Sequence, residues 1–253
     1  GVAAWDNVLS QELLCALDTA VDHFYNFTFT NGWVYARSRF PGVQVHASST
    51  VWLPSDAPPV SAPELAARCI LERVLRGSAD EYAGIEYWGR VRSVNLGASL
   101  HYDQPQDAEE EGVDGFAANP WRPEWSSVLY LTDKGGPTVI LDQISCEEEL
   151  YSPSIPLRGH VCMPRRNRLV VFRGDLFHGQ LPEKIWHDTS EMRRIFVFNF
   201  WKGHTPEAPH CQRQDLSQHP AAQHMLLRPD DCRALEEAEA RPREALVPVP
   251  RTA

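Results

Sequence analysis

The chain has 253 residues, and its 24 lysines and arginines against 34 aspartates and glutamates give a formal net charge of −10. This balance disfavours non-specific binding to nucleic acid or to an anionic membrane. No apolar run approaches the roughly 18 residues of a membrane-spanning helix. An apolar fraction of 43% is enough for one sizeable core. A globular protein is therefore favoured, and a nucleic-acid partner is disfavoured.

The cysteines are scattered along the chain, and none forms a Cys-x-x-Cys pair. They are Cys15, Cys69, Cys146, Cys162, Cys211 and Cys232. Such spacing argues against a structural zinc site and against a small disulfide-stapled scaffold. Reduced thiols, and with them an intracellular location, are the favoured interpretation.

The N-terminal part is predicted to contain helices and short strands. Apolar residues at spacings of three and four predict an amphipathic helix: Leu9, Leu13, Leu14, Leu17, Val21 and Phe24. A second helix is predicted to begin at Ser61, which can cap it, with Glu64 at the capping-box position, and to end near Gly77. The β-branched and aromatic segments 33–35, 43–45 and 50–53 are predicted strands.

From residue 86 onward short β segments dominate. They are residues 86–96, 126–131, 138–141, 169–172 and 195–201, and turn-forming residues separate most of them. Short strands of this kind predict a sandwich or barrel with helices on one side. The acidic run 107–114 is interpreted as a solvated loop rather than a determinant of substrate choice. After Trp201 the chain is expected to be largely irregular, with one short helix around residues 233–239.

A candidate metal site lies around His101 and Asp103. Residues i and i+2 of a strand point the same way, so this imidazole and this carboxylate can be directed to one point. His178, which follows the predicted strand 169–172, is the candidate third ligand. Two imidazoles and one carboxylate on one face of a metal suit non-haem Fe(II) and leave positions for a co-substrate and O₂. His187, in a polar stretch, is the nearest rival for the third position.

The order of these motifs resembles that of the Fe(II)/2-oxoglutarate-dependent oxygenases, and within them the prolyl-hydroxylase-like branch of the double-stranded β-helix (jelly-roll) superfamily. The resemblance spans about half the chain, from Tyr87 to Trp201. It is carried by Glu86-Tyr87-Trp88, His101-Tyr102-Asp103, residues 127–132, Gly135-Gly136-Pro137-Thr138, residues 168–178 and residues 193–201. The implied fold is mainly β, with flanking helices around a double-stranded β-helix core.

The resemblance implies roles for individual residues. His101, Asp103 and His178 would be the iron ligands and the catalytic centre. The related halogenases lack the carboxylate of Asp103, so its presence implies hydroxylation or another oxidation.

The co-substrate would be held by an arginine that opens the last core strand. A guanidinium pairs bidentately with a carboxylate and stays charged at any working pH. Only one of two adjacent strand residues can face inward. Alignment of the strand favours Arg194 over Arg193. Tyr130 lies where related hydroxylases place a tyrosine that hydrogen-bonds with the same carboxylate.

The implied function is that of an Fe(II)- and 2-oxoglutarate-dependent dioxygenase. It would hydroxylate a C–H bond of a peptidyl side chain or small molecule and release succinate and CO₂, with ascorbate as a candidate reductant. One domain is expected, with three segments. Residues 1–85 would buttress the core, residues 86–202 would form the catalytic core, and residues 203–253 would be a partly irregular extension.

Two alternatives stay open: a non-catalytic, cupin-like protein that binds a metal or small ligand, and an oxygenase that acts on a modified nucleobase. The arginine after the distal histidine favours an enzyme, because a mere metal-binding barrel has no need of it. Several tryptophans are candidate pocket residues, although core packing is favoured: Trp88, Trp121, Trp125 and Trp186. A solvated face is favoured over a phosphate site for Arg158, Arg165, Arg166 and Arg168.

Overall fold

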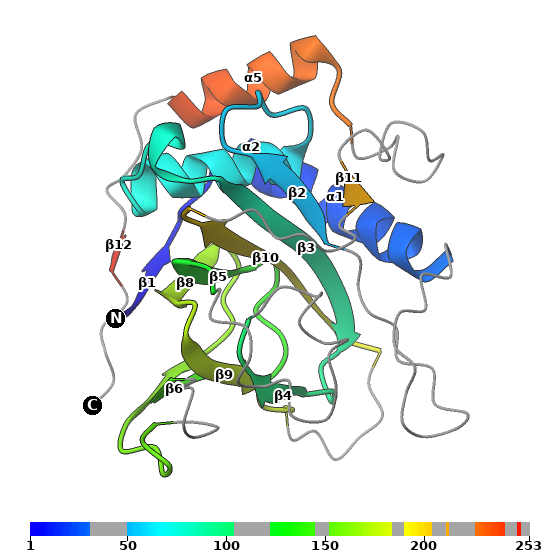
Figure 1. The fold of residues 1–253 in the computed structure, drawn as a ribbon. Coiled ribbons are helices and arrows are strands. Elements are labelled where there is room, and N and C mark those ends of the chain that lie inside the picture. Colours follow the sequence, from blue (N-terminus) through cyan, green and yellow to red (C-terminus); the bar gives the residue numbers. More distant parts are fainter. Residues whose placement is uncertain are drawn as a thin grey trace.

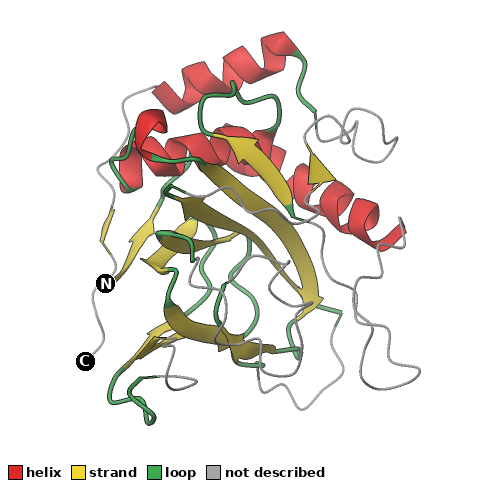
Figure 2. Ribbon diagram, in the orientation of Figure 1, coloured by secondary structure: helices red, strands yellow, loops and turns green. Residues whose placement is uncertain are grey.

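Strands are the commonest secondary structure, and helices α1, α2 and α5 lie together on one side of the molecule (Figures 1 and 2). The computed structural model describes residues 1–30, 50–103, 122–144, 152–183, 190–203, 211–212, 226–240 and 247–248. The strands are β1 (Val2–Asp6), β2 (Val51–Pro54), β3 (Gly84–Ser93), β4 (Ala98–His101), β5 (Trp125–Tyr130), β6 (Thr138–Ile144), β7 (Gly159–Cys162), β8 (Arg168–Arg173), β9 (Leu176–Gln180), β10 (Met192–Trp201), β11 (Cys211–Gln212) and β12 (Val247–Pro248). The helices are α1 (Gln11–Thr30), α2 (Ala62–Cys69), which continues as a π-helical turn (Ile70–Val74), a short 3₁₀ turn (Ala79–Glu81) and α5 (Pro229–Ala240).

The strands form two sheets. The larger has the order β11-β2-β3-β10-β5-β8-β1-β12, and the smaller has the order β4-β9-β6-β7. All pairings are antiparallel except that of β11 with β2. Residues of both sheets line a common pocket. This arrangement confirms the predicted fold class, a mainly β double-stranded β-helix with flanking helices.

The helices cover the outer face of the larger sheet. Leu13, Leu17 and Val21 are fully buried on one stripe of α1, as the predicted amphipathic pattern requires. A Cβ placed on Gly89 of β3 would lie 3.1 Å from Val21 and 3.0 Å from Phe196 of β10, so α1 packs against these two strands. Helix α5 lies across α1 and α2 (Figure 1).

Helix α2 begins as the sequence predicts. The Oγ of Ser61 accepts a hydrogen bond from the backbone N–H of Glu64 at 3.4 Å. The carboxylate of Glu64 accepts one from the N–H of Val60 at 2.6 Å rather than from that of Ser61. The carboxylate still satisfies a backbone donor at the helix start, one residue earlier than in a regular capping box.

Strand β10 has two buried faces with different surroundings. Arg193, Ile195 and Val197 line the pocket between the sheets. The intervening Phe196 and Phe198 are fully buried on the other face, which is where α1 packs. This alternation places one arginine of the strand inside the barrel.

Most predicted elements are confirmed with small shifts of their ends. The helices at the N-terminus and after Ser61 are present, as is the predicted C-terminal helix, now α5. The predicted strands of residues 50–53 and of residues 86 onward correspond to β2, β3, β5, β6, β8 and β10. The predicted strands 33–35 and 43–45 and the acidic run 107–114 lie outside the described residues. None of the helices in the described ranges has the length and apolar character needed to cross a membrane.

The arginine cluster before β8 is used for packing. Arg165 and Arg168 both bind the carboxylate of Asp6 in β1 at 2.7–3.0 Å. Arg166 binds Asp18 of α1 at 2.5 Å. These three arginines hold the first strand and helix against the sheet. The sequence favoured a solvated face, and this differs from the structure at Arg168, whose side chain is only 13% exposed. Among the described residues, Cys15, Cys69, Cys162 and Cys232 form no disulfide bond with one another.

Candidate metal centre

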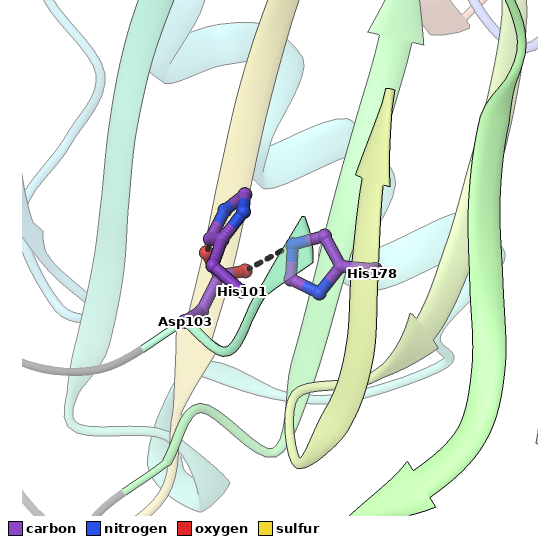
Figure 3. A group of neighbouring side chains, drawn as sticks. All are labelled: His101, Asp103 and His178. Atoms are coloured by element: carbon purple, nitrogen blue, oxygen red, sulfur yellow. Dashed lines mark ion pairs between the residues drawn. The ribbon is translucent and has the colours of Figure 1, made fainter. Parts of the chain in front are cut away.

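The three predicted metal ligands meet at one point between the sheets (Figure 3). His101 ends β4 and lies directly opposite His178 of β9 in the antiparallel ladder. Asp103 follows two residues after His101, just beyond the end of β4. Its Oδ1 lies 3.7 Å from Nε2 of His101, and its Oδ2 lies 3.5 Å from Nε2 of His178. The candidate ligand atoms all lie within 4.8 Å of one another.

Backbone carbonyls orient both imidazoles. Nδ1 of His101 lies 2.8 Å from the carbonyl oxygen of Ser99, and Nδ1 of His178 lies 2.9 Å from that of Leu176. When Nδ1 donates to these carbonyls, the lone pair of each Nε2 faces the carboxylate of Asp103. In metal-ligating histidines, the ring nitrogen that does not bind the metal typically donates a hydrogen bond in this way, which fixes the tautomer and the orientation of the ring.

The local electrostatics favour the forms of the side chains that bind a metal. Burial alone would raise the pKa of Asp103, but the imidazoles of His178 and His101 outweigh it and hold that pKa below its usual value. Burial lowers the pKa of His178. An ionised carboxylate and a neutral imidazole are the protonation states that a metal ion requires. Oδ2 of Asp103 is buried and accepts no hydrogen bond within the described part of the chain, so a cation fits there.

The candidate ligands lie in a cavity that is partly open to solvent. The side chain of His178 is 8% exposed and that of Asp103 is 7% exposed, whereas that of His101 is 44% exposed toward the mouth. Apolar residues form part of the wall: Trp88, Val128, Phe172, Ile195 and Val197. The site is therefore largely shielded from water and open on one side.

The predicted orientation of the two arginines of β10 is corrected by the structure. Arg193 lines the cavity and is 4% exposed. Its Nη1 donates to Oε1 of Gln180, and its Nη2 donates to Oγ1 of Thr138 at 3.1 Å. Arg194 points the other way, where its guanidinium pairs with Asp22 of α1. Adjacent strand residues face opposite sides of the sheet, so Arg194 cannot reach the pocket.

Tyr130 lies beside Arg193 but is not among the residues that line the cavity. The guanidinium carbon of Arg193 lies 5.3 Å from the centre of its ring. The hydroxyl of Tyr130 is 2.6 Å from Oγ1 of Thr138 and 3.2 Å from the carbonyl oxygen of Cys162. Burial raises the pKa of Tyr130. Its predicted contact with a co-substrate stays a prediction.

The two glycines of the Gly-Gly-x-Thr turn leave room for the side chain of Arg193 and for the backbone of Leu181. Gly135 has a φ of +96°, and a Cβ there would lie 2.7 Å from Cδ of Arg193. A Cβ on Gly136 would lie 1.9 Å from the backbone oxygen of Leu181. Larger residues would therefore displace the arginine or the backbone beside it.

Several pocket residues were not singled out from the sequence, among them Arg90, Arg92 and Gln180. Arg90 and Arg92 follow Trp88 at intervals of two along β3, so the strand alternation was the signal that could have found them. Trp88 lines the cavity, as one interpretation allowed. His187, Trp121 and Trp186 lie outside the described residues, and Trp125 is not part of the pocket wall within the described ranges.

A second carboxyl group is buried behind the site. Glu86 of β3 is 3% exposed, and its neighbour across the ladder in β10 is Asn199. Burial raises the pKa of Glu86 to about 7, and the charge of Asp103 contributes, while the polar side chains of Thr50, Trp201 and Asn199 partly oppose the shift. Asn199 and Trp201 therefore lie beside a carboxyl group close to the metal ligands.

Comparisons with known proteins found similar solved structures at low sequence identity. No protein-family model matches the chain. No curated protein matches its sequence. Similar solved structures include a prolyl-4-hydroxylase from Pseudomonas putida, with 16% identity and a TM-score of 0.46 over 81% of this chain and 94% of that one. AviO1 from Streptomyces viridochromogenes Tue57 has 14% identity and a TM-score of 0.48 over 83% and 93%. EvdO2 from Micromonospora carbonacea var. aurantiaca, complexed with 2-oxoglutarate, has 16% identity and a TM-score of 0.44 over 83% and 90%.

The chain's own features define its fold. Its two antiparallel sheets enclose a pocket with two histidines and an aspartate on one side and a buried arginine on the other. Its motifs follow the order of the family that the sequence resembles. The chain has a mainly β, double-stranded β-helix fold.

Proposed function

We propose that the chain is an Fe(II)- and 2-oxoglutarate-dependent dioxygenase that hydroxylates a C–H bond of a peptidyl side chain or small molecule. His101, Asp103 and His178 would hold the iron. Arg193, in place of the predicted Arg194, would bind the far carboxylate of 2-oxoglutarate. The chemistry supplied by bound iron is the oxidative decarboxylation of 2-oxoglutarate by O₂, with one oxygen atom entering succinate and the other the substrate C–H bond.

One observation carries this proposal: a buried arginine that has no acidic partner among the described residues faces the candidate metal ligands. The hydrogen-bonding partners of Arg193 within the described residues are the neutral side chains of Gln180 and Thr138. Burial lowers the pKa of Arg193, which means that its charged form is poorly solvated. A buried charge without a counter-ion is costly. A dicarboxylic co-substrate removes that cost by placing a carboxylate on the guanidinium.

The residues of the chain would divide the work as follows. Thr138 and Gln180 orient the guanidinium of Arg193 toward the cavity, so that it is organised before the co-substrate arrives. Asp103 stays ionised and the two Nε2 lone pairs stay available for the metal. Phe172 and the other apolar wall residues limit the access of water to the reacting C–H bond.

The test is an anaerobic titration of metal-free protein with Fe(II) and then 2-oxoglutarate, followed by the visible charge-transfer band of the chelate. Wild type is expected to form the band and Asp103→Ala is expected to lose it. Arg193→Gln should weaken 2-oxoglutarate binding at least about 30-fold, because truncating one partner of a buried charge pair costs about 2 kcal/mol or more. Arg194→Gln is the matched control, since this arginine pairs with Asp22 on the outer face.

The result also decides between this proposal and its rival. A cupin-like binding protein would hold a metal without forming the chelate, whatever the residue at position 193. If wild type binds Fe(II) and never forms the chelate, the oxygenase proposal fails. If Arg194→Gln weakens the binding of 2-oxoglutarate as much as Arg193→Gln, the assignment of the arginine fails.

A further inference from the structure

Two arginines face each other across the ladder between β3 and β10. Arg92 is paired with Arg193 in this register, and both line the cavity between the sheets. Directly opposed residues of antiparallel strands share one face of the sheet, with their Cβ atoms about 4.5–5.5 Å apart. The guanidinium of Arg92 therefore lies on the same wall of the cavity as the one to which the proposed function assigns the far carboxylate of 2-oxoglutarate.

The charges of the two arginines act on each other. Burial is the main cause that lowers the pKa of Arg193, and the charge of Arg92 lowers it further, against opposing contributions from Tyr130 and Cys162. Burial also lowers the pKa of Arg92. Like charges at directly opposed positions destabilise a sheet. An anion between the two guanidinium groups would replace this repulsion by two attractive contacts.

Neither guanidinium has an acidic partner within the described residues. Arg193 donates to the neutral side chains of Gln180 and Thr138, and its buried Nε is left without an acceptor there. Arg92 makes no hydrogen bond or ion pair within the same ranges. Among the described residues that line the cavity, Asp103 is the one carboxylate, and in the proposed function it binds the metal. Both arginines therefore keep donors available for a carboxylate.

We propose that Arg92 is a second anchor for the co-substrate, so that the far carboxylate of 2-oxoglutarate accepts hydrogen bonds from both Arg92 and Arg193. This inference rests on the proposed function, to which it adds a binding residue on β3. A carboxylate has two oxygens with about four acceptor positions, so it can accept from two guanidinium groups at once. Hydrogen bonds between charged groups are about twice as strong as those between neutral ones.

The two anchors restrain the carboxylate from different directions. Thr138 of β6 and Gln180 of β9, both in the smaller sheet, hold the guanidinium of Arg193. Arg92 is presented by β3 in the larger sheet. A carboxylate restrained in this way fixes the position of the oxo-acid end at the metal. A 2-oxo acid with an uncharged far end should therefore bind much more weakly than 2-oxoglutarate.

The first experiment compares two ligands that differ only at the far end. Protein loaded with Ni(II) is titrated calorimetrically with 2-oxoglutarate and with 2-oxopentanoate, in which a methyl group replaces the far carboxylate. Arg92→Gln should weaken the binding of 2-oxoglutarate at least about tenfold, because it removes a hydrogen bond between charged groups. It should leave the binding of 2-oxopentanoate unchanged. Arg194→Gln, on the opposite face of β10, is the matched control and should bind both ligands as wild type does.

The pair of ligands separates a lost contact from a damaged fold. If Arg92→Gln binds 2-oxoglutarate as tightly as wild type, the inference is overturned. It is also overturned if the substitution weakens the binding of both ligands by the same factor, because the loss then does not depend on the far carboxylate.

The same titration distinguishes failure of this inference from failure of the proposed function. If wild type binds Ni(II) and does not bind 2-oxoglutarate, the proposed function fails. If wild type binds 2-oxoglutarate, and Arg193→Gln weakens this binding while Arg92→Gln does not, only the role of Arg92 is refuted.

The second experiment uses the product. Succinate retains the carboxylate that 2-oxoglutarate would place on the two arginines. Arg92→Gln should therefore weaken the binding of succinate to the Ni(II) protein by a factor similar to that for 2-oxoglutarate. If succinate binds the variant as tightly as it binds wild type, Arg92 does not hold the carboxylate that the two molecules share, and the inference is overturned.

Discussion

The buried carboxyl group of Glu86 makes the stability of the metal-free protein depend on pH. Glu86 is 3% exposed, and burial raises its pKa from 4.5 to about 7. At about 1.36 kcal/mol per pKa unit, this shift corresponds to roughly 3 kcal/mol between the two protonation states. Glu86→Gln keeps the shape of the side chain and cannot ionise, so it should remove this contribution.

The sign follows from proton binding. The folded protein holds the Glu86 proton up to about pH 7, whereas the unfolded chain releases it near pH 4.5. The folded state therefore binds more protons within this window, and the free energy of unfolding falls as the pH rises through it. Between pH 5 and pH 8 the contribution of Glu86 to that loss should be about 2 to 3 kcal/mol.

The assay is urea denaturation of metal-free wild type and Glu86→Gln at pH 5, 6, 7 and 8. Only the difference between the two proteins is interpreted, because other groups titrate equally in both. Between pH 5 and pH 8, the free energy of unfolding of Glu86→Gln should rise by about 2 to 3 kcal/mol relative to that of wild type. Parallel pH profiles would refute the reasoning and would mean that Glu86 ionises in the folded state as easily as in the unfolded chain.

Three further substitutions test the packing around the site. Asp6→Asn should lower the free energy of unfolding at pH 7 by about 1–3 kcal/mol in a urea titration, because it weakens the pair with Arg168. The hydrogen bond from Arg168 is the main reason that the pKa of Asp6 lies below its usual value. The loss of unfolding free energy in Asp6→Asn should therefore shrink as the pH falls through the pKa of Asp6 in the folded protein. A loss that does not depend on pH would contradict this reasoning. Leu17→Ala should cost about 2–5 kcal/mol in the same titration, because Leu17 is fully buried; a cost below about 1 kcal/mol would contradict its place in the core. Gly135→Ala should weaken calorimetrically measured 2-oxoglutarate binding by displacing Arg193, and unchanged affinity would argue against that contact.

The metal ligands and the glycine turn could be predicted from the sequence, because each requires particular residue types at particular positions. His101, Asp103 and His178 were predicted from their order, and the structure brings them together from the end of β4 and from β9. The turn of Gly135 and Gly136 could also be located, because only small residues fit beside the packed chain. Here local chemistry leaves a pattern that does not depend on knowing the whole fold.

The orientation of β10 could not be obtained in the same way. Both faces of this strand are buried, so Ile195 and Val197 on one side and Phe196 and Phe198 on the other are equally apolar. A strand buried on both faces shows no alternation of polar and apolar residues. Nothing in the strand itself therefore indicates whether Arg193 or Arg194 faces inward, and the answer depends on which face α1 covers.

The short strands at the margins were missed for a related reason. Strand β1 has five residues and depends on pairing with β8, far along the chain, rather than on a local pattern. Strands β4 and β7 are four residues long, with much of each exposed to solvent. Segments of this length contain too few positions for a period of two to be recognised.

The central claim is that one molecule of 2-oxoglutarate lies between the metal and Arg193. A crystal structure of the protein grown with Ni(II) and 2-oxoglutarate tests it most directly. The account predicts nickel bound by His101, Asp103 and His178, with the far carboxylate of 2-oxoglutarate paired to the guanidinium of Arg193. A metal bound by other residues, or a far carboxylate paired to Arg90 or Arg92 in place of Arg193, would contradict it.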